Sequence, residues 1–566
     1  MTKQSRLKQF TLLNSVALVV AGLVSVPVLS VLWSLFQPGQ GNWPHLVQTV
    51  LPGYVANSLV LMAGVAIGVT ILGVGPAWLV VMCKFPGRGL FEWLLILPLA
   101  LPAYVVAYAY TDFFQGSGPV QTLLRDLTGW TFQDYWFPNI RSIEGAIVIF
   151  SAVLMPYTYL LSRKAFLEQS LCVLEVASIL GRTPWNRFRT IALPLARPAI
   201  VAGTALALME TLADFGTVAH FGINTFTTGI YRTWFSMGDR VAAAQLSSIL
   251  MAFVFALLLL ELYSRKQARF YHTTGRYRPV APAELRGVKA CGATLFCAAP
   301  VVIGFLAPFC ILLWMALTGG HDLFSRRYID LMSNSVLLAG IAAILAVALA
   351  LLLGFAVRFS RSSITSGAAL VAGMGYAIPG SIIAVGVLLP AAAFDHALSD
   401  WLEVKFGIKT GLLLTGSIAA LVFAYLVRFM AVALHTVQSS MAKITPNMED
   451  AARTLGHGST STVVRVHLPI MSGGMMTAGL IVFVDVMKEL PASLIMRPFN
   501  FDTLAIQAYN LAKDERLTQA ATPSLVILAC GLIPVLLLSR SIMRSRPGSR
   551  ASEMVPGAIV APIPAP

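Results

Sequence analysis

Long apolar stretches are the feature that most restricts how this chain can fold. A helix needs about 20 consecutive apolar residues to cross a bilayer. Twelve stretches of this kind are present, at 13–36, 55–83, 90–111, 145–162, 198–219, 242–263, 289–317, 334–357, 367–393, 411–436, 473–494 and 523–539. Only 11% of the residues are charged, whereas about a quarter are charged in soluble proteins. We therefore expect an all-α, polytopic membrane protein with about 12 transmembrane helices.

The basic residues predict how these helices are oriented in the membrane. Lys3, Arg6 and Lys8 precede the first stretch, and Arg540 and Arg544 follow the last, so the positive-inside rule predicts that both termini are cytoplasmic. The first stretch is too long for a cleavable signal peptide and lacks a small-residue cleavage site, so we expect it to stay as an anchor. The net charge of +15 then belongs mainly to cytoplasmic loops that face anionic lipid and an acidic protein partner. Nucleic acid is not an expected partner.

One motif occurs twice. Glu175-Val-Ala-Ser-Ile-Leu-Gly181 is followed by Ile191-Ala-Leu-Pro194, and Asp450-Ala-Ala-Arg-Thr-Leu-Gly456 is followed by Val466-His-Leu-Pro469. Gly181 and Gly456 differ by 275 in residue number, as do Pro194 and Pro469. Asn57-Ser-Leu-Val and Asn334-Ser-Val-Leu also align, with an offset of 277. The chain is therefore interpreted as a tandem duplication of a six-helix unit.

The duplication predicts four regions. They are a first half at 1–264, a linker at 265–288, a second half at 289–546 and a tail at 547–566. The linker is rich in Arg, Lys and Pro and lacks apolar periodicity, which is typical of a cytoplasmic connection. The tail is rich in Pro, Ala and Ser without a pattern, so we expect it to be disordered.

The motif itself predicts a short cytoplasmic helix before a membrane span. In the second copy, Thr445-Pro446 is typical of an N-cap followed by Pro in the first turn, and Gly456 is typical of a helix end. Pro194 and Pro469 are expected to interrupt the helix before it enters the bilayer. Such a helix, with small Ala side chains and a nearby acid, suits docking in the cleft of a partner protein.

At these residues the chain resembles the permease subunits of ABC importers. Their "EAA" loop has Glu-Ala-Ala, three residues, Gly, nine residues and then Ile-x-Leu-Pro; Val176 and Asp450 are the departures here. The resemblance implies the type I ABC importer fold and a coupling helix that sits in a groove of the ATPase. The implied coupling residues are Glu175, Ala177, Gly181, Pro194, Glu449, Asp450, Ala451, Ala452, Gly456 and Pro469, where Glu449 is an alternative to Asp450 as the acid.

The chain has no phosphate-binding loop, because no Gly-Lys dipeptide occurs in it. We therefore expect no catalytic residues and no cofactor on this chain, and ATP and Mg on a separate ATPase. Two coupling loops in one chain imply two copies of that ATPase. The resemblance also implies the bacterial inner membrane and an extracytoplasmic substrate-binding protein, either periplasmic or lipid-anchored.

Acidic residues follow each motif within an apolar stretch. Glu210 and Asp214 align with Asp485 and Glu489 at an offset of 275. Ionisable groups at such depth usually face a bundle interior or a water-filled path, so these four acids are predicted to line the translocation path. The alternative is a structural role, in which they pair with Lys488, Arg232 or backbone groups. An acidic path favours a cationic substrate.

Further segments resemble the fused permeases of ferric-iron importers, namely 208–217, 228–235 and 484–491. Fused permeases for thiamine and for 2-aminoethylphosphonate share the architecture, so these substrates stay open. A secondary transporter, which also has two six-helix halves, and a non-transporting scaffold are the alternatives from other classes. No metal site, zinc site or disulfide is expected. Tyr104, Tyr108 and Tyr110 are interpreted as interfacial aromatics.

Overall fold

The computed structural model describes residues 3–38, 42–168, 183–266, 283–319, 325–360 and 362–544. The first half contains α1 (Lys3–Trp33), η1 (Ser34–Phe36), α2 (Trp43–Thr49), α3 (Leu51–Met82), β1 (Cys83–Lys84), α4 (Arg88–Leu94), η2 (Leu97–Ala100), α5 (Ala103–Phe114), α6 (Pro119–Thr128), α7 (Ile143–Glu168), α9 (Pro184–Arg187), η3 (Phe188–Ala192), α10 (Leu193–Ala213), α11 (Gly216–His220), α12 (Phe226–Phe235) and α13 (Arg240–Lys266).

The second half repeats much of this order. After β2 (Ala283–Glu284) in the linker, it contains α14 (Val288–Val301), η4 (Val302–Leu306), α15 (Ala307–Thr318), α16 (Arg326–Ser360), α17 (Ser363–Ala372), η5 (Gly375–Ala377), α18 (Gly380–Phe406), α19 (Ile418–Met441), α20 (Pro446–Thr454), α21 (Ser459–Thr462), η6 (Val463–His467), α22 (Leu468–Met487), α23 (Pro491–Met496), α24 (Leu504–Lys513) and α25 (Leu517–Arg544).

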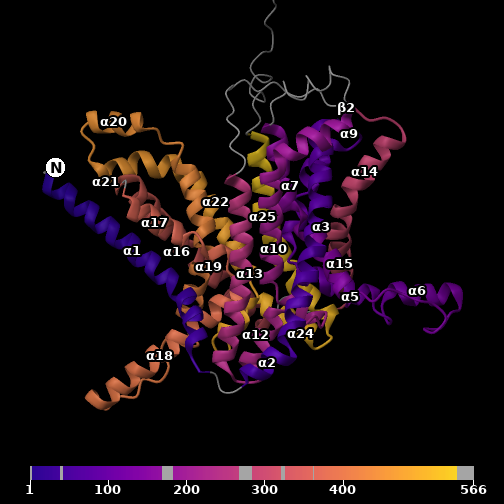
Figure 1. The fold of residues 1–566 in the computed structure, drawn as a ribbon, viewed down its shortest axis with the longest axis horizontal. Helices are drawn as coiled ribbons and strands as arrows, with labels where there is room; N and C mark the ends of the chain where they lie inside the picture. Colours follow the sequence, from indigo (N-terminus) through magenta and orange to yellow (C-terminus); the bar gives the residue numbers. More distant parts are fainter. Residues whose placement is uncertain are drawn as a thin grey trace, which may run out of the picture.

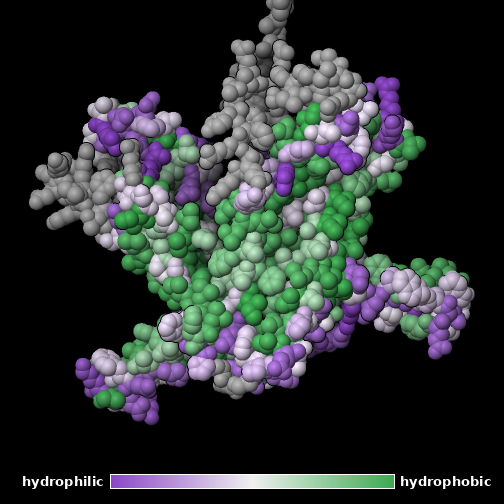
Figure 2. Space-filling view, in the orientation of Figure 1, coloured by the Kyte–Doolittle hydropathy of each residue, from purple (hydrophilic) through white to green (hydrophobic). Residues whose placement is uncertain are grey.

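The prediction of an all-α membrane protein is confirmed. Among the described residues, eleven helices are long and apolar enough to cross a bilayer, and a bent pair raises the number to twelve. The bent pair consists of Arg88–Ala100 and Ala103–Thr128, which meet at 90° where Pro98 and Pro102 interrupt the helix. Figure 2 shows a broad hydrophobic band around the middle of the molecule and hydrophilic residues at its two ends.

The two halves interlock through their first helices. Helix α1 packs against α16, α17 and α18 of the second half, and Asn14 accepts a hydrogen bond of 2.9 Å from Thr365. In the other direction, α14 and α15 pack against α3, α5 and α7 of the first half. Each half therefore completes the helical packing of the other (Figure 1).

Short helices after α10 and α22 repeat the duplication in three dimensions. Helices α11 and α12 correspond to α23 and α24, and α12 and α24 lie at the end of the molecule opposite α20 (Figure 1). Asn57 donates a 2.9 Å hydrogen bond to the Asn224 carbonyl, and Asn334 donates a 3.2 Å bond to the Asp502 carbonyl. Both acceptors directly precede the N-cap of α12 or α24. The aligned asparagines of the two halves thus have the same structural role, which is to hold the start of α12 or α24.

The expectation that Pro194 and Pro469 interrupt a helix was wrong. Each proline lies in one continuous span, Trp185–Ala213 or Thr460–Met487. A π-helical segment precedes each proline: η3 before Pro194 and η6 before Pro469. In these segments the amides of Leu193 and Leu468 bond to carbonyls five residues earlier. The wider turn accommodates the proline, which lacks an N–H, without ending the helix.

Two short strands are the one departure from an all-helical chain in the part that the structure describes. Strand β1 pairs in parallel with β2, and Lys84 lies 3.5 Å from Glu284. Strand β2 falls at the end of the predicted linker, so this end of the linker is held against the end of α3. Residues 267–282 and 545–566, which include most of the linker and the whole tail, lie outside the described residues.

Candidate functional site

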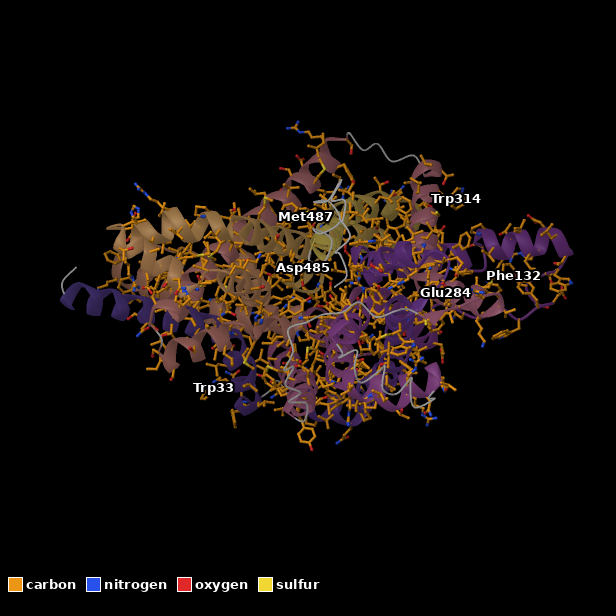
Figure 3. All side chains as sticks on the ribbon, turned by 90° about the horizontal axis from the view of Figure 1, so that it is seen from above. Trp33, Phe132, Glu284, Trp314, Asp485 and Met487 are labelled. Carbon is orange, nitrogen blue, oxygen red and sulfur yellow. The ribbon has the colours of Figure 1, made fainter. Side chains whose placement is uncertain are left out.

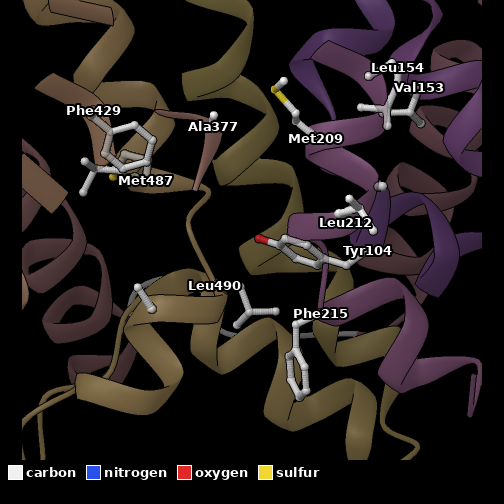
Figure 4. Close-up of a cluster of buried hydrophobic side chains, with 14 of the residues drawn as sticks. Tyr104, Val153, Leu154, Met209, Leu212, Phe215, Ala377, Phe429, Met487 and Leu490 are labelled. Atoms are coloured by element: carbon white, nitrogen blue, oxygen red, sulfur yellow. The ribbon is translucent and has the colours of Figure 1, made fainter. Parts of the chain in front are cut away.

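A cavity of about 120 Å³ lies between the two halves. All four predicted path acids line it, together with Arg428 and Lys488. Seen from above, Asp485 lies near the middle of the molecule, whereas Phe132 lies at its edge near α6 (Figure 3). Figure 4 shows a cluster of buried apolar side chains from both halves; Phe215, Phe429 and Leu490 of this cluster line the cavity.

Asp214 and Glu489, the second acid of each half, are bound to backbone amides. The Asp214 carboxylate accepts hydrogen bonds from the N–H groups of Thr217 and Val218, at 2.9 and 3.3 Å. The Glu489 carboxylate accepts from the N–H groups of Ala492 and Ser493, at 2.9 and 3.0 Å. Both acids therefore stabilise the start of the short helix that follows, α11 or α23.

The two acids of each half do not lie on one helix, because α10 ends at Ala213 and α22 ends at Met487. Asp214 and Glu489 lie beyond these ends, so the four-residue spacing does not place them on the same helix as Glu210 and Asp485. They reach the same cavity through the loop that follows each helix.

Glu210 and Asp485, the first acid of each half, have basic side chains as their partners. The Glu210 side chain is 26% exposed, and its ion pair with Arg428 is 4.0 Å long. The Asp485 side chain is 13% exposed and lies 2.8 Å from the ammonium group of Lys488. Glu210 is therefore the cavity carboxylate with the loosest partner, and Asp485 is available to a substrate that displaces Lys488.

Arg428 is the main cavity residue that the sequence reasoning missed. It lies in α19 and is 8% exposed. Its guanidinium is 3.2 Å from Glu489 of its own half and 4.0 Å from Glu210 of the other half. A lone arginine inside the apolar stretch 411–436 was the signal that could have found it. The expected alternative partner Arg232 instead donates to Asn224.

Three tyrosines correct another expectation. Tyr104, Tyr108 and Tyr110 were interpreted as interfacial aromatics, but they are 4%, 1% and 7% exposed. Tyr104 lines the cavity, and its hydroxyl donates a 3.4 Å hydrogen bond to the Lys488 carbonyl. The interpretation was wrong because 90–111 was predicted to be a single straight helix. The break at Pro102 instead turns α5 into the bundle.

The second copy of the motif forms the short helix that was predicted. Helix α20 starts after the N-cap Thr445, has Pro446 in its first turn and is followed by Gly456, whose φ of 84° is left-handed. Ala452 of this helix is buried, whereas Asp450 and Ala451 are exposed. Helix α20 lies at one end of the molecule, opposite α12 and α24 (Figure 1).

The two acids of α20 have different surroundings. Glu449 lies 2.6 Å from Arg358 of α16 and 3.3 Å from His467 of η6. The Asp450 side chain is 66% exposed and has an ion pair with Arg453, one turn away on the same helix. Glu449 thus holds α20 on the membrane-spanning helices, and Asp450 points away from them. Glu175, Ala177 and Gly181 of the first copy lie outside the described residues.

One ion pair joins the halves near the opposite end. Both terminal nitrogens of Arg141, before α7, bind the carboxylate of Glu515, before α25, at 3.0 and 2.8 Å. These hydrogen bonds hold the pKa of the Glu515 carboxyl below its usual range. The pair therefore stays ionised at neutral pH.

Fold and cavity together define the class: an α-helical, multi-spanning transport protein with two related halves and charged groups where they meet. A family model described as "Binding-protein-dependent transport system inner membrane component" matches residues 69–267. The chain belongs to this family. It is thus a permease subunit of a binding-protein-dependent ABC importer and a multi-pass protein of the inner membrane.

Individual relatives resemble the chain over different lengths. The Fe(3+)-transport system permease protein FbpB 2 of Haemophilus influenzae is 26% identical and covers 86% of this chain and 89% of its own. The molybdenum transport system permease protein ModB of Escherichia coli is 30% identical over 38% of this chain and 91% of its own. A putative 2-aminoethylphosphonate permease, PhnU of Salmonella choleraesuis, is 27% identical over 41% of this chain and 81% of its own.

Proposed function

We propose that this chain is the fused permease of a ferric-iron importer, in which one polypeptide supplies both halves of the translocation path. One observation carries the proposal. Glu210 and Asp485, which the duplication relates to each other, reach a single cavity between the halves. Their carboxylates are partly exposed, while Asp214 and Glu489 are occupied by backbone amides.

The charge of the cavity favours a cation. Four acids line it, and Arg428 and Lys488 are the basic residues among its described lining. Arg428 lies against Glu489 and Lys488 against Asp485, so neither positive charge is free for an anion. A cation in a site of low dielectric is stabilised by the excess of carboxylates, and an oxyanion is repelled by it.

Two relatives support the assignment in different ways. The ferric permease from Haemophilus influenzae covers most of this chain. The molybdenum permease is matched over 91% of its length by 38% of this chain, which leaves room for a second unit of the same size. Thiamine and 2-aminoethylphosphonate remain the alternative substrates to be tested.

The coupling role is proposed on the exposure of α20. Asp450, Ala451 and Gly456 form an accessible surface at the end of the molecule, suited to contact with an ATPase subunit. By the duplication, Glu175, Ala177 and Gly181 supply the second contact. One chain then binds two ATPase copies, and these hold ATP and Mg. The ATPase copies and both termini of the chain lie on the cytoplasmic side. A binding protein delivers the substrate from the opposite side.

Reconstitution tests the substrate. The chain, its ATPase and its binding protein would be placed in proteoliposomes and supplied with labelled ferric citrate, molybdate, thiamine or 2-aminoethylphosphonate. We expect ATP-dependent accumulation of iron alone, strongly reduced in E210Q/D485N. Accumulation of one of the other three compounds without iron would refute the ferric assignment.

A further inference from the structure

The acidic residues of the cavity occur in both halves, whereas its basic residues occur in the second half. Arg428 corresponds to Val153 and Lys488 to Ala213 at the offset of 275, and all four positions line the cavity. The acids occur in both halves, so the two halves differ in charge. The two bases have therefore been added to, or kept in, one half alone, and a symmetric role in packing does not account for them.

Arg428 has one firm partner and one loose partner. Its bond to Glu489 is 3.2 Å long, and the Glu489 side chain is 2% exposed. Its distance to Glu210 is 4.0 Å, at the limit of an ion pair, and Glu210 is 26% exposed. Within the described part of the chain, the buried Nε of Arg428 has no hydrogen-bond partner, so the guanidinium is not fixed on every side.

The packing protects the firm pair. Gly380, the first residue of α18, lies so close that a Cβ there would collide with both the Arg428 guanidinium and the Glu489 carboxylate. Glu489 also accepts bonds from two backbone amides and from the Ser493 hydroxyl, at 2.9, 3.0 and 2.7 Å. Arg428 can therefore leave Glu210 without becoming an unpaired buried charge, which would be costly.

We propose that Arg428 is a resident counter-ion that sets how tightly the cavity binds a cation. In the empty cavity it neutralises Glu210 across the boundary between the halves. A cationic substrate takes its place at Glu210, and Glu489 retains the displaced arginine. Arg428 thereby weakens cation binding enough for release, as a transit site requires. The inference rests on the proposed cationic substrate and assigns the residue that tunes its binding.

Direct binding of a redox-inert trivalent cation tests this role. Citrate-buffered Ga³⁺ would be titrated against the purified full-length permease, without a binding protein, and bound metal would be measured by mass spectrometry. In R428Q the Kd is expected to decrease at least about tenfold, because a positive charge about 4 Å from Glu210 is removed. In R428K, which keeps the charge, the Kd should stay within about threefold.

A second variant keeps the test decisive if R428Q is poorly folded. R428Q/E489Q removes both members of the firm pair and leaves Glu210 free, so tighter Ga³⁺ binding is again expected. Unchanged or weaker binding in the folded variants would overturn the proposal. If R428Q tightens Ga³⁺ binding but ferric iron is not transported, the proposed function fails and the role of Arg428 stands.

Discussion

Arg358 of α16 lies 2.6 Å from Glu449 of α20, and the same guanidinium donates to the carbonyls of Met441 and Ile444 at 3.0 and 2.8 Å. One arginine thus fastens the short helix, the preceding turn and a membrane span together. A force applied to α20 is transmitted to α16 through charge-assisted hydrogen bonds, which are about twice as strong as neutral ones.

Glu449→Gln should therefore uncouple ATP hydrolysis from transport. Loss of one charge-assisted bond in a half-buried place costs about 1.5–3 kcal/mol, enough to release α20 for a large fraction of the time. We expect ATPase activity to continue while uptake per ATP falls about tenfold. Asp450→Asn is the matched control: it removes an exposed pair with Arg453, so it should leave the position of α20 unchanged and weaken ATPase binding instead. The opposite assignment of effects would show that Glu449 is the acid that meets the ATPase.

Gly456→Val should weaken ATPase binding, because it disturbs the backbone conformation at the end of α20. Its φ of 84° disfavours any residue with a Cβ, and a left-handed β-branched residue costs on the order of 1–2 kcal/mol. Space is not limiting, because a Cβ at Gly456 would meet no atom within 4 Å. Gly458 has the same open surroundings without the left-handed φ, so Gly458→Val is the control. Copurification of the ATPase should fall in the first variant only, and equal copurification would contradict the prediction.

Substitutions of the two acids of the first half should have different effects, one on stability and the other on transport. Asp214→Ala removes the cap of α11 and should lower the free energy of unfolding by about 1 kcal/mol. Glu210→Gln removes no hydrogen bond that holds the fold and should leave the melting temperature unchanged while strongly reducing uptake. Thermal unfolding and uptake would be measured on the same preparations. A stable D214A protein together with an unstable E210Q protein would reverse the roles assigned to them.

The Arg141–Glu515 contact should depend on pH. The folded pKa of Glu515 is lowered, so its contribution is present above the unfolded value of about 4.3 and is lost as the pH falls through the folded value. The Glu515 side chain is 60% exposed, so solvent screening limits the contribution to about 1 kcal/mol or less. Glu515→Gln should lower thermal stability slightly at pH 7 and have a smaller effect near pH 3, below the unfolded pKa. An effect of equal size at both pH values would contradict an ionic contact.

Much of this organisation could be predicted from the sequence because it depends on local patterns. Most spans, the repeat offset and the caps of α20 are read from neighbouring residues, and they agree with the structure. The predicted spans 90–111 and 367–393 were wrong in their bounds, because the helix breaks before Ala103 and before Gly380. The bend at Pro102, the π-helical turns before Pro194 and Pro469, and the bridge from Arg428 to Glu210 could not be predicted in this way. They depend on which distant helices pack together, and a single sequence does not contain that information.

The most direct test of the whole account is the source of energy for uptake. Proteoliposomes that contain this chain, its ATPase and its binding protein should accumulate ferric iron only when ATP is present on the ATPase side, and a proton or sodium gradient alone should drive none. Accumulation driven by an ion gradient with the ATPase absent would contradict the assignment of this chain as the permease of an ATP-driven importer.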